Sequence, residues 1–166
     1  ISGIIPSMVY YGLNLFNPSI FLPLTLLVTS IVSMTTGSSY TTSATVGIAL
    51  IAVGTAFNIS AGMTAGAVIS GAYFGDKMSP LSDTTNLAPA VTGTDLFTHI
   101  RHMIWTTGPS LIISLVLFLI LGFQSSSAGN DSGLEIIQSS IKGSFNISPL
   151  SFIPLLVVFI MAYKKV

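Results

Sequence analysis

Apolar residues fill long stretches of this chain, and short polar segments separate them. Residues 18–34 are apolar and long enough to cross a bilayer, which takes about 20 helical residues. Residues 104–123 form a clear span without any charged residue, residues 147–163 form a last span, and residues 4–16 match the end of another. The pattern predicts an all-α, polytopic membrane protein, because helices satisfy their own backbone hydrogen bonds in lipid.

Two further apolar stretches, residues 44–57 and 61–75, are shorter than the usual span of about 17–25 residues. The hydroxyl-rich residues 35–43 precede them and contain no charge. This segment is either a short connecting turn or an unwound or re-entrant break whose oxygens face a cavity at membrane depth. In transporters, short or glycine-interrupted segments are typical of discontinuous helices around a substrate site. We therefore expect the functional centre in this part of the chain.

Glycines recur at a spacing of four within residues 61–75. Gly62 and Gly66 form one pair, and Gly71 and Gly75 form another. Small residues at this spacing let the backbones of two membrane helices approach closely. We expect one helix here to pack tightly against a neighbour.

Composition supports a membrane protein and excludes several other classes. Of the 166 residues, only 6% are charged and 51% are hydrophobic, whereas soluble domains carry about 25% charge. Five basic residues balance five acidic ones, so there is no basic field for nucleic acid. The chain has no cysteine, which excludes disulfides and thiolate metal sites.

Positive residues predict the orientation in the membrane. Arg101, with His99 and His102, precedes the span at 104–123, and Lys164 and Lys165 end the last span. The positive-inside rule places both ends in the cytoplasm, and residues 124–146 then form an extracytoplasmic loop. We expect a multi-pass protein of the cell membrane.

The beginning of the chain also bears on its organisation. It starts at Ile1 and shows no signal-peptide pattern. We interpret residues 1–166 as a single membrane domain, an interior part of a longer transporter.

The candidate ion site is the polar segment 76–86. Pro80 disfavours a continuous helix, and the residues after it suit the cap of a new helix. A carboxylate in a low-dielectric site can hold either a proton or a cation. An ordinary cytoplasmic turn with a helix cap is the alternative. The oxygens available to a hard cation such as sodium come from Asp76, Ser79, Ser82, Asp83, Thr84, Thr85 and Asn86.

Asp83 is the favoured carboxylate for binding sodium and protons, with Asp76 second. Lys77 follows Asp76 directly and either pairs with it or keeps its ammonium in water. Asp95 suits a helix cap better than a ligand. His99 and His102 lack a third metal ligand, so they indicate an interfacial anchor or a pH sensor.

Motifs of common enzymes are missing. The sequence contains no Gly-x-Ser-x-Gly elbow, no His-Glu-x-x-His helix and no phosphate-binding glycine loop. We therefore expect neither an enzyme nor a bound cofactor; sodium and protons are the expected cargo.

Residues 65–88, which contain the run GDKMSPLSDTTN at 75–86, resemble the NhaC family of sodium/proton antiporters. The resemblance continues through residues 94–102 and 105–109. Upstream, residues 36–42 are similar to the family's Gly-Thr-Ser-Trp-Gly-Thr element, with Tyr40 in place of tryptophan and Thr41 in place of glycine.

The resemblance implies exchange of Na+ for H+ by alternating access. It also implies inverted repeats whose broken or re-entrant helices meet at a midplane ion site. Six residues of the polar segment would belong to the ion pathway, namely Asp76, Ser79, Asp83, Thr84, Thr85 and Asn86. Gly37, Ser38 and Ser39 would line an opposing break.

Other functions remain open at this level. Some members of the same family resemble an exchanger that couples malate and proton uptake to sodium-linked lactate exit. A passive ion pore, or a membrane module that only packs against partners, would fit the hydropathy equally well. Membrane lipid, sodium and protons are the expected partners, with malate or lactate under the exchanger alternative.

Overall fold

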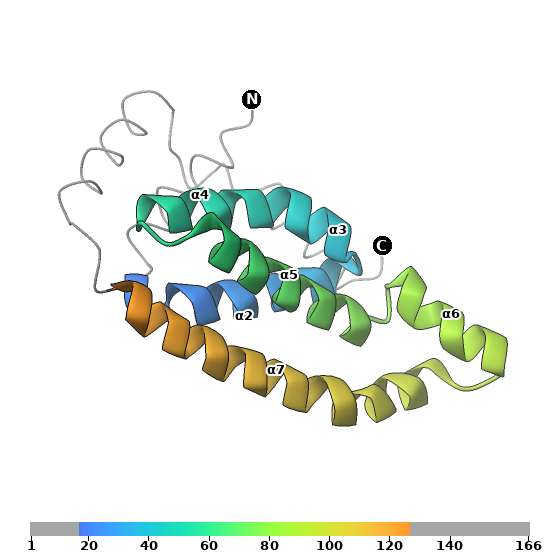
Figure 1. The fold of residues 1–166 in the computed structure, drawn as a ribbon. Coiled ribbons are helices and arrows are strands. Elements are labelled where there is room, and N and C mark those ends of the chain that lie inside the picture. The colour runs from blue at the N-terminus through green and yellow to red at the C-terminus, as the bar shows by residue number, and fades with distance from the viewer. Residues whose placement is uncertain (1–16, 127–166) are drawn as a thin grey trace.

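The computed structural model describes residues 17–126, and this part of the chain is entirely helical where it is regular (Figure 1). The all-α prediction is confirmed for these residues. The predicted stretches 4–16 and 147–163, most of the loop 124–146, and Lys164 and Lys165 lie outside them. The elements in order are η1 (Pro18–Ile20), α2 (Phe21–Thr36), α3 (Ser39–Thr42), the π-helical η2 (Ser43–Gly47), α4 (Ile48–Ala56), α5 (Ala61–Met78), α6 (Asp83–Thr92) and α7 (Leu96–Ser126).

Within residues 17–126, three helical segments are long and apolar enough to cross a membrane: Pro18–Thr36, Ser39–Ala56 and Leu96–Gln124. The first confirms the span expected at 18–34. The second is longer than the apolar stretch 44–57, because the hydroxyl-rich residues 39–43 are helical. Two of these hydroxyls bond within the same segment: Thr42 Oγ1 donates to the carbonyl of Ser38 at 2.9 Å, and Thr41 Oγ1 donates to Ser38 Oγ at 3.0 Å. The predicted break at 35–43 is therefore reduced to Gly37 and Ser38.

Helix α7 is a single helix of 31 residues. It joins the expected interfacial segment around Arg101 to the span at 104–123, and it includes residues 124–126, which we expected in a loop. Asp95 caps its start, as expected: Oδ2 accepts from the Thr98 backbone N–H at 2.9 Å and from the Thr98 hydroxyl at 3.1 Å. These two bonds, the backbone bond above all, lower the pKa of the Asp95 carboxyl.

Helix α5 lies at the centre of the bundle and has its most extensive contact with α2. Figure 1 shows α2 and α5 running in one direction, with α3–α4 and α7 running in the other. A Cβ at Gly71 would clash with the carbonyl oxygen of Leu26, and one at Gly75 would clash with that of Ser30. The close approach predicted from the glycine spacing is confirmed for Gly71 and Gly75, whereas a Cβ at Gly62 or Gly66 would meet no backbone atom of a neighbouring helix within 4 Å among the described residues.

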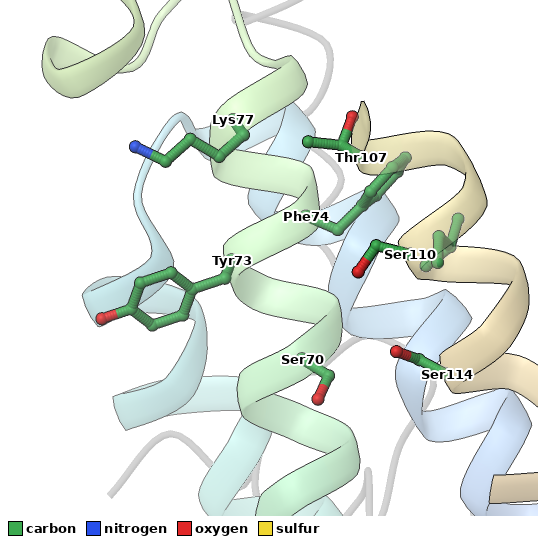
Figure 2. A pocket seen from close by; sticks show the side chains of 8 residues that line it. Ser70, Tyr73, Phe74, Lys77, Thr107, Ser110 and Ser114 are labelled. Carbon is green, nitrogen blue, oxygen red and sulfur yellow. The ribbon is translucent and has the colours of Figure 1, made fainter. Parts of the chain in front are cut away.

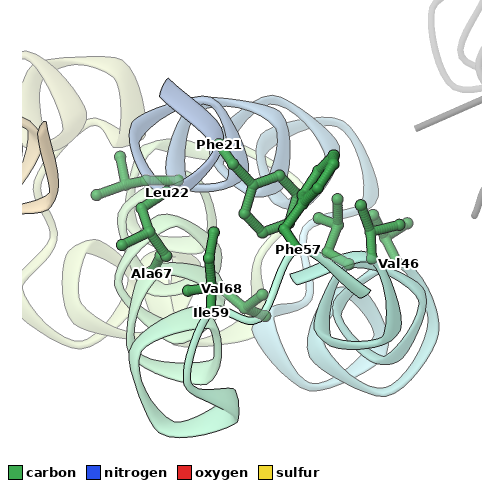
Figure 3. Close-up of a cluster of buried hydrophobic side chains, with 10 residues drawn as sticks. Phe21, Leu22, Val46, Phe57, Ile59, Ala67 and Val68 are labelled. Atoms are coloured by element: carbon green, nitrogen blue, oxygen red, sulfur yellow. The ribbon is translucent and has the colours of Figure 1, made fainter. Parts of the chain in front are cut away.

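A hydrophobic cluster holds α2, α4 and α5 together near the start of α2 (Figure 3). Phe21 and Phe57 meet edge to face, with ring centroids 5.4 Å apart, a favoured aromatic geometry. Leu26, Val53 and Val68 are almost completely buried in the cluster. The two polar breaks lie at the other end of these helices. The hydrophobic cluster and the candidate ion site are therefore at opposite ends of the helices.

Candidate ion site

The break between α2 and α3 touches the break between α5 and α6. Gly37 has φ +67°, and a Cβ placed on it would lie 2.7 Å from the carbonyl carbon of Leu81. A glycine is needed here both for the left-handed backbone and for the lack of space. The fold thus brings together two segments that are more than 40 residues apart in the sequence.

Asp76 lies beside this contact, in the last turn of α5, and only 7% of its surface is exposed. The Ser39 hydroxyl, at the start of α3, donates to Asp76 Oδ2 at 3.1 Å. Thr85 Oγ1 donates to the Asp76 backbone carbonyl at 3.1 Å, which ties α6 to the end of α5. The buried carboxylate is therefore positioned by both breaks.

The Lys77 ammonium is directed toward α6. Its Nζ lies 3.4 Å from the Thr84 hydroxyl. Adjacent residues on a helix project about 100° apart. The Lys77 ammonium and the Asp76 carboxylate therefore point in different directions, although the two residues are neighbours in the sequence.

Polar side chains close the turn between α5 and α6. Ser79 Oγ accepts from the Leu81 backbone N–H at 3.2 Å, and Ser82 Oγ lies 3.0 Å from Thr84 Oγ1. The Asn86 amide donates to the carbonyls of Pro80 and Ser82, both at 2.8 Å. Ser79 and Ser82 are buried. These side chains replace the backbone hydrogen bonds that a continuous helix would make.

Asp83 is exposed at the first position of α6. Within residues 17–126 its carboxylate has no hydrogen-bond partner, unlike that of Asp76. The sequence argument placed Asp83 first because of Lys77, whereas the structure places Asp76 in the buried position. Of the opposing break, Gly37 and Ser39 reach the polar segment, while Ser38 caps α3 by accepting from the Thr41 backbone N–H at 3.2 Å.

Helix α2 carries a row of buried hydroxyl side chains that was not predicted from the sequence. Thr25, Thr29 and Ser33 are buried, and Ser33 Oγ donates to the Ala72 carbonyl of α5 at 2.6 Å. Thr25 Oγ1 is buried and has no hydrogen-bond partner among residues 17–126. Their spacing of four residues, which puts them on one helix face, was visible in the sequence.

Comparison with known proteins identifies relatives along the whole chain. The chain is 45% identical to the Na+/H+ antiporter NhaC of Alkalihalophilus pseudofirmus, over 99% of this chain and 35% of that protein. It is 42% identical to the malate-2H+/Na+-lactate antiporter of Bacillus subtilis, over 98% of this chain and 35% of the relative. The arginine/ornithine antiporter ArcD of Halobacterium salinarum is also 42% identical, with 98% and 34% covered.

The chain spans about a third of the length of these relatives. No solved structure matches it. The profile of the Na+/H+ antiporter family matches residues 71–166, which include Asp76 and the whole of the α5–α6 break. The family consists of transporters, not enzymes. The chain therefore belongs to the Na+/H+ antiporter family, as a relative of NhaC.

Proposed function

We propose that the full-length protein exchanges Na+ for H+ across the cell membrane by alternating access, with Asp76 as the carboxylate that the two ions share. The observation that supports this is the burial of Asp76 between the ends of α5 and α3, with the Ser39 hydroxyl 3.1 Å from Oδ2. A buried carboxylate avoids an uncompensated charge by binding a proton or a cation. Competition of the two ions for one group couples their movements.

The surrounding breaks would supply the other sodium ligands. Hard cations take oxygen ligands, and broken transporter helices offer carbonyls that are free of helical hydrogen bonds. Ser39, Ser79 and Thr85 are buried hydroxyl residues near Asp76. Asp83, Thr84 and Asn86 lie further out and would line the approach. Contact between the breaks at Gly37 and Leu81 lets a change in one break reach the other.

A malate-proton/sodium-lactate exchanger is the second candidate, since the Bacillus subtilis antiporter of that name is 42% identical. It retains coupling of sodium and protons and adds an organic anion. The arginine/ornithine antiporter at the same identity shows that relatives differ in substrate.

The test uses everted vesicles that contain the full-length protein and hold a proton gradient. We expect added sodium to release protons without any organic acid. A response that appears only with malate and lactate would assign the second candidate. Sodium flux without proton movement would indicate a passive pore, and no flux of either ion would indicate a packing module; both results would contradict antiport.

Ser39→Ala should weaken the apparent affinity for sodium about tenfold, because a hydrogen bond to a charged group contributes about 1.5–3 kcal/mol and about 1.4 kcal/mol corresponds to a factor of ten. The measurement is the sodium concentration that gives half-maximal proton release. Ser39→Thr keeps a hydroxyl and should restore most of the affinity. Ser43→Ala, one turn further along the same segment, is the matched control. An unchanged sodium dependence in Ser39→Ala would remove Ser39 from the site.

A further inference from the structure

A cavity of about 280 Å³ opens between α5 and α7 (Figure 2), and neither Ser39 nor Asp76 lines it. Its lining positions follow one helix face on each side, with a spacing of three or four residues. Besides Phe74 and Leu111, the lining consists of polar residues: Ser70, Tyr73 and Lys77 from α5, and Thr107, Ser110 and Ser114 from α7.

Three serine hydroxyls in this cavity have no hydrogen-bond partner among residues 17–126. Hydroxyls in the middle of a helix usually donate to the carbonyl one turn back, as Thr107 does to Met103 at 2.8 Å. Within the described residues, by contrast, Ser70, Ser110 and Ser114 have no hydrogen-bond partner. Figure 2 shows the Ser110 and Ser114 hydroxyls pointing toward α5.

The charge of the lining favours an anion. Lys77 is the charged residue of the lining, and no carboxylate takes part. An ammonium can only donate hydrogen bonds, and hydroxyls can all donate at once to an acceptor. In Figure 2 the Lys77 ammonium points away from Ser110 and Ser114. Its contact with Thr84 Oγ1 is long, at 3.4 Å, so the flexible side chain can give up this contact and turn toward the cavity to make a stronger, charge-assisted bond.

The location argues for a solute in water rather than for lipid. Ser110 and Ser114 lie within the candidate span Leu96–Gln124, where unpaired hydroxyls facing hydrocarbon would be costly. The opposite side of α7 carries exposed apolar residues such as Ile112 and Ile113, which suit lipid.

We infer that the cavity between α5 and α7 binds the carboxylate of a small organic anion, with Lys77 as counter-charge and Ser70, Ser110 and Ser114 as hydrogen-bond donors. This site is separate from Asp76, and it rests on the proposed function only in taking the protein to be a transporter. Such a site would allow a relative of the sodium/proton antiporters to bind an organic acid.

The test measures how fast a cysteine in the cavity reacts. The chain itself has no cysteine, so Thr107→Cys is introduced into the full-length protein with any other cysteine removed. Thr107 lines the cavity but is not one of the proposed donors, because its hydroxyl donates to the Met103 carbonyl. An anionic methanethiosulfonate reagent should label the introduced cysteine at least about tenfold faster than a cationic one, as expected for electrostatic steering in a charged cleft. L-malate should slow this labelling.

Matched variants distinguish the effect of the Lys77 charge from the effect of how accessible the cysteine is to the reagents. Lys77→Gln should abolish both the preference for the anionic reagent and the protection by malate, whereas Lys77→Arg should retain them. Ile112→Cys, on the apolar side of the same helix, should show neither effect.

Three results would overturn the inference: a preference for the cationic reagent, labelling that malate does not slow, or a Thr107→Cys that reacts with neither reagent. The last result would mean that lipid or another segment of the chain fills the cavity. Labelling does not depend on proton exchange, so failure of this inference is distinguishable from failure of the proposed antiport.

Discussion

Asp76→Asn should reduce sodium-dependent proton release by the full-length protein to the level of vesicles without it. Asparagine has almost the same shape as aspartate, but it cannot take up and release a proton, and it offers sodium a weaker ligand. The substitution also removes the charge whose burial makes ion binding necessary, since an empty buried carboxylate is unfavourable. Asp76 is 7% exposed and its carboxylate accepts a hydrogen bond from Ser39. The measurement is proton release after a sodium pulse, at matched protein levels.

Asp83→Asn provides the matched comparison, because it makes the same chemical change seven residues away at an exposed position. We expect Asp83→Asn to retain most of the exchange activity, with at most a lower apparent affinity for sodium. Asp76→Glu should keep partial activity, since it moves the carboxylate without removing it. If Asp83→Asn abolished exchange and Asp76→Asn did not, the assignment of the shared carboxylate to Asp76 would be wrong.

The sequence alone does not show which of these two carboxylates is buried. The break after α5 follows from Pro80, and the oxygen-rich composition of 76–86 is plain from the sequence. Which aspartate is buried depends on the direction in which the last turn of α5 faces, and hence on where α3 packs. Ser39 contacts Asp76 across 37 residues, and no local pattern contains that information.

The apolar pattern predicted one helical span and one close helix contact correctly, and it failed at the hydroxyl-rich residues. The span at 18–34 agrees with α2, and the Gly71–Gly75 spacing correctly predicted the close α2–α5 contact. Residues 39–43 were expected outside a helix because hydroxyl residues compete with the helical backbone. In the structure Thr42 and the neighbouring Thr45 donate to carbonyls one turn back, so these hydroxyls are accommodated in a helix.

Gly75→Ala should destabilise the full-length protein by about 1–3 kcal/mol or more, the range for adding a methyl group where there is no space. The new Cβ would clash with the Ser30 carbonyl oxygen and would lie 2.7 Å from the Met34 backbone nitrogen. Backbone atoms of α2 cannot rotate away as a side chain can, so α2 and α5 must separate. Thermal unfolding of the purified protein in detergent measures the loss.

Gly62→Ala is the control within the same helix, because the nearest atom to its Cβ would be Ser60 Oγ at 3.7 Å. Alanine there should be neutral or stabilising by up to about 1 kcal/mol, as glycine is a poor helix former. Gly75→Ala should also impair exchange in the molecules that remain folded, since Asp76 is the next residue and separation of α5 from α2 shifts it relative to Ser39. Equal stability of the two variants would show that α2 and α5 are further apart than the structure places them. A destabilised Gly75→Ala with unchanged exchange would instead show that the position of Asp76 tolerates movement of α5.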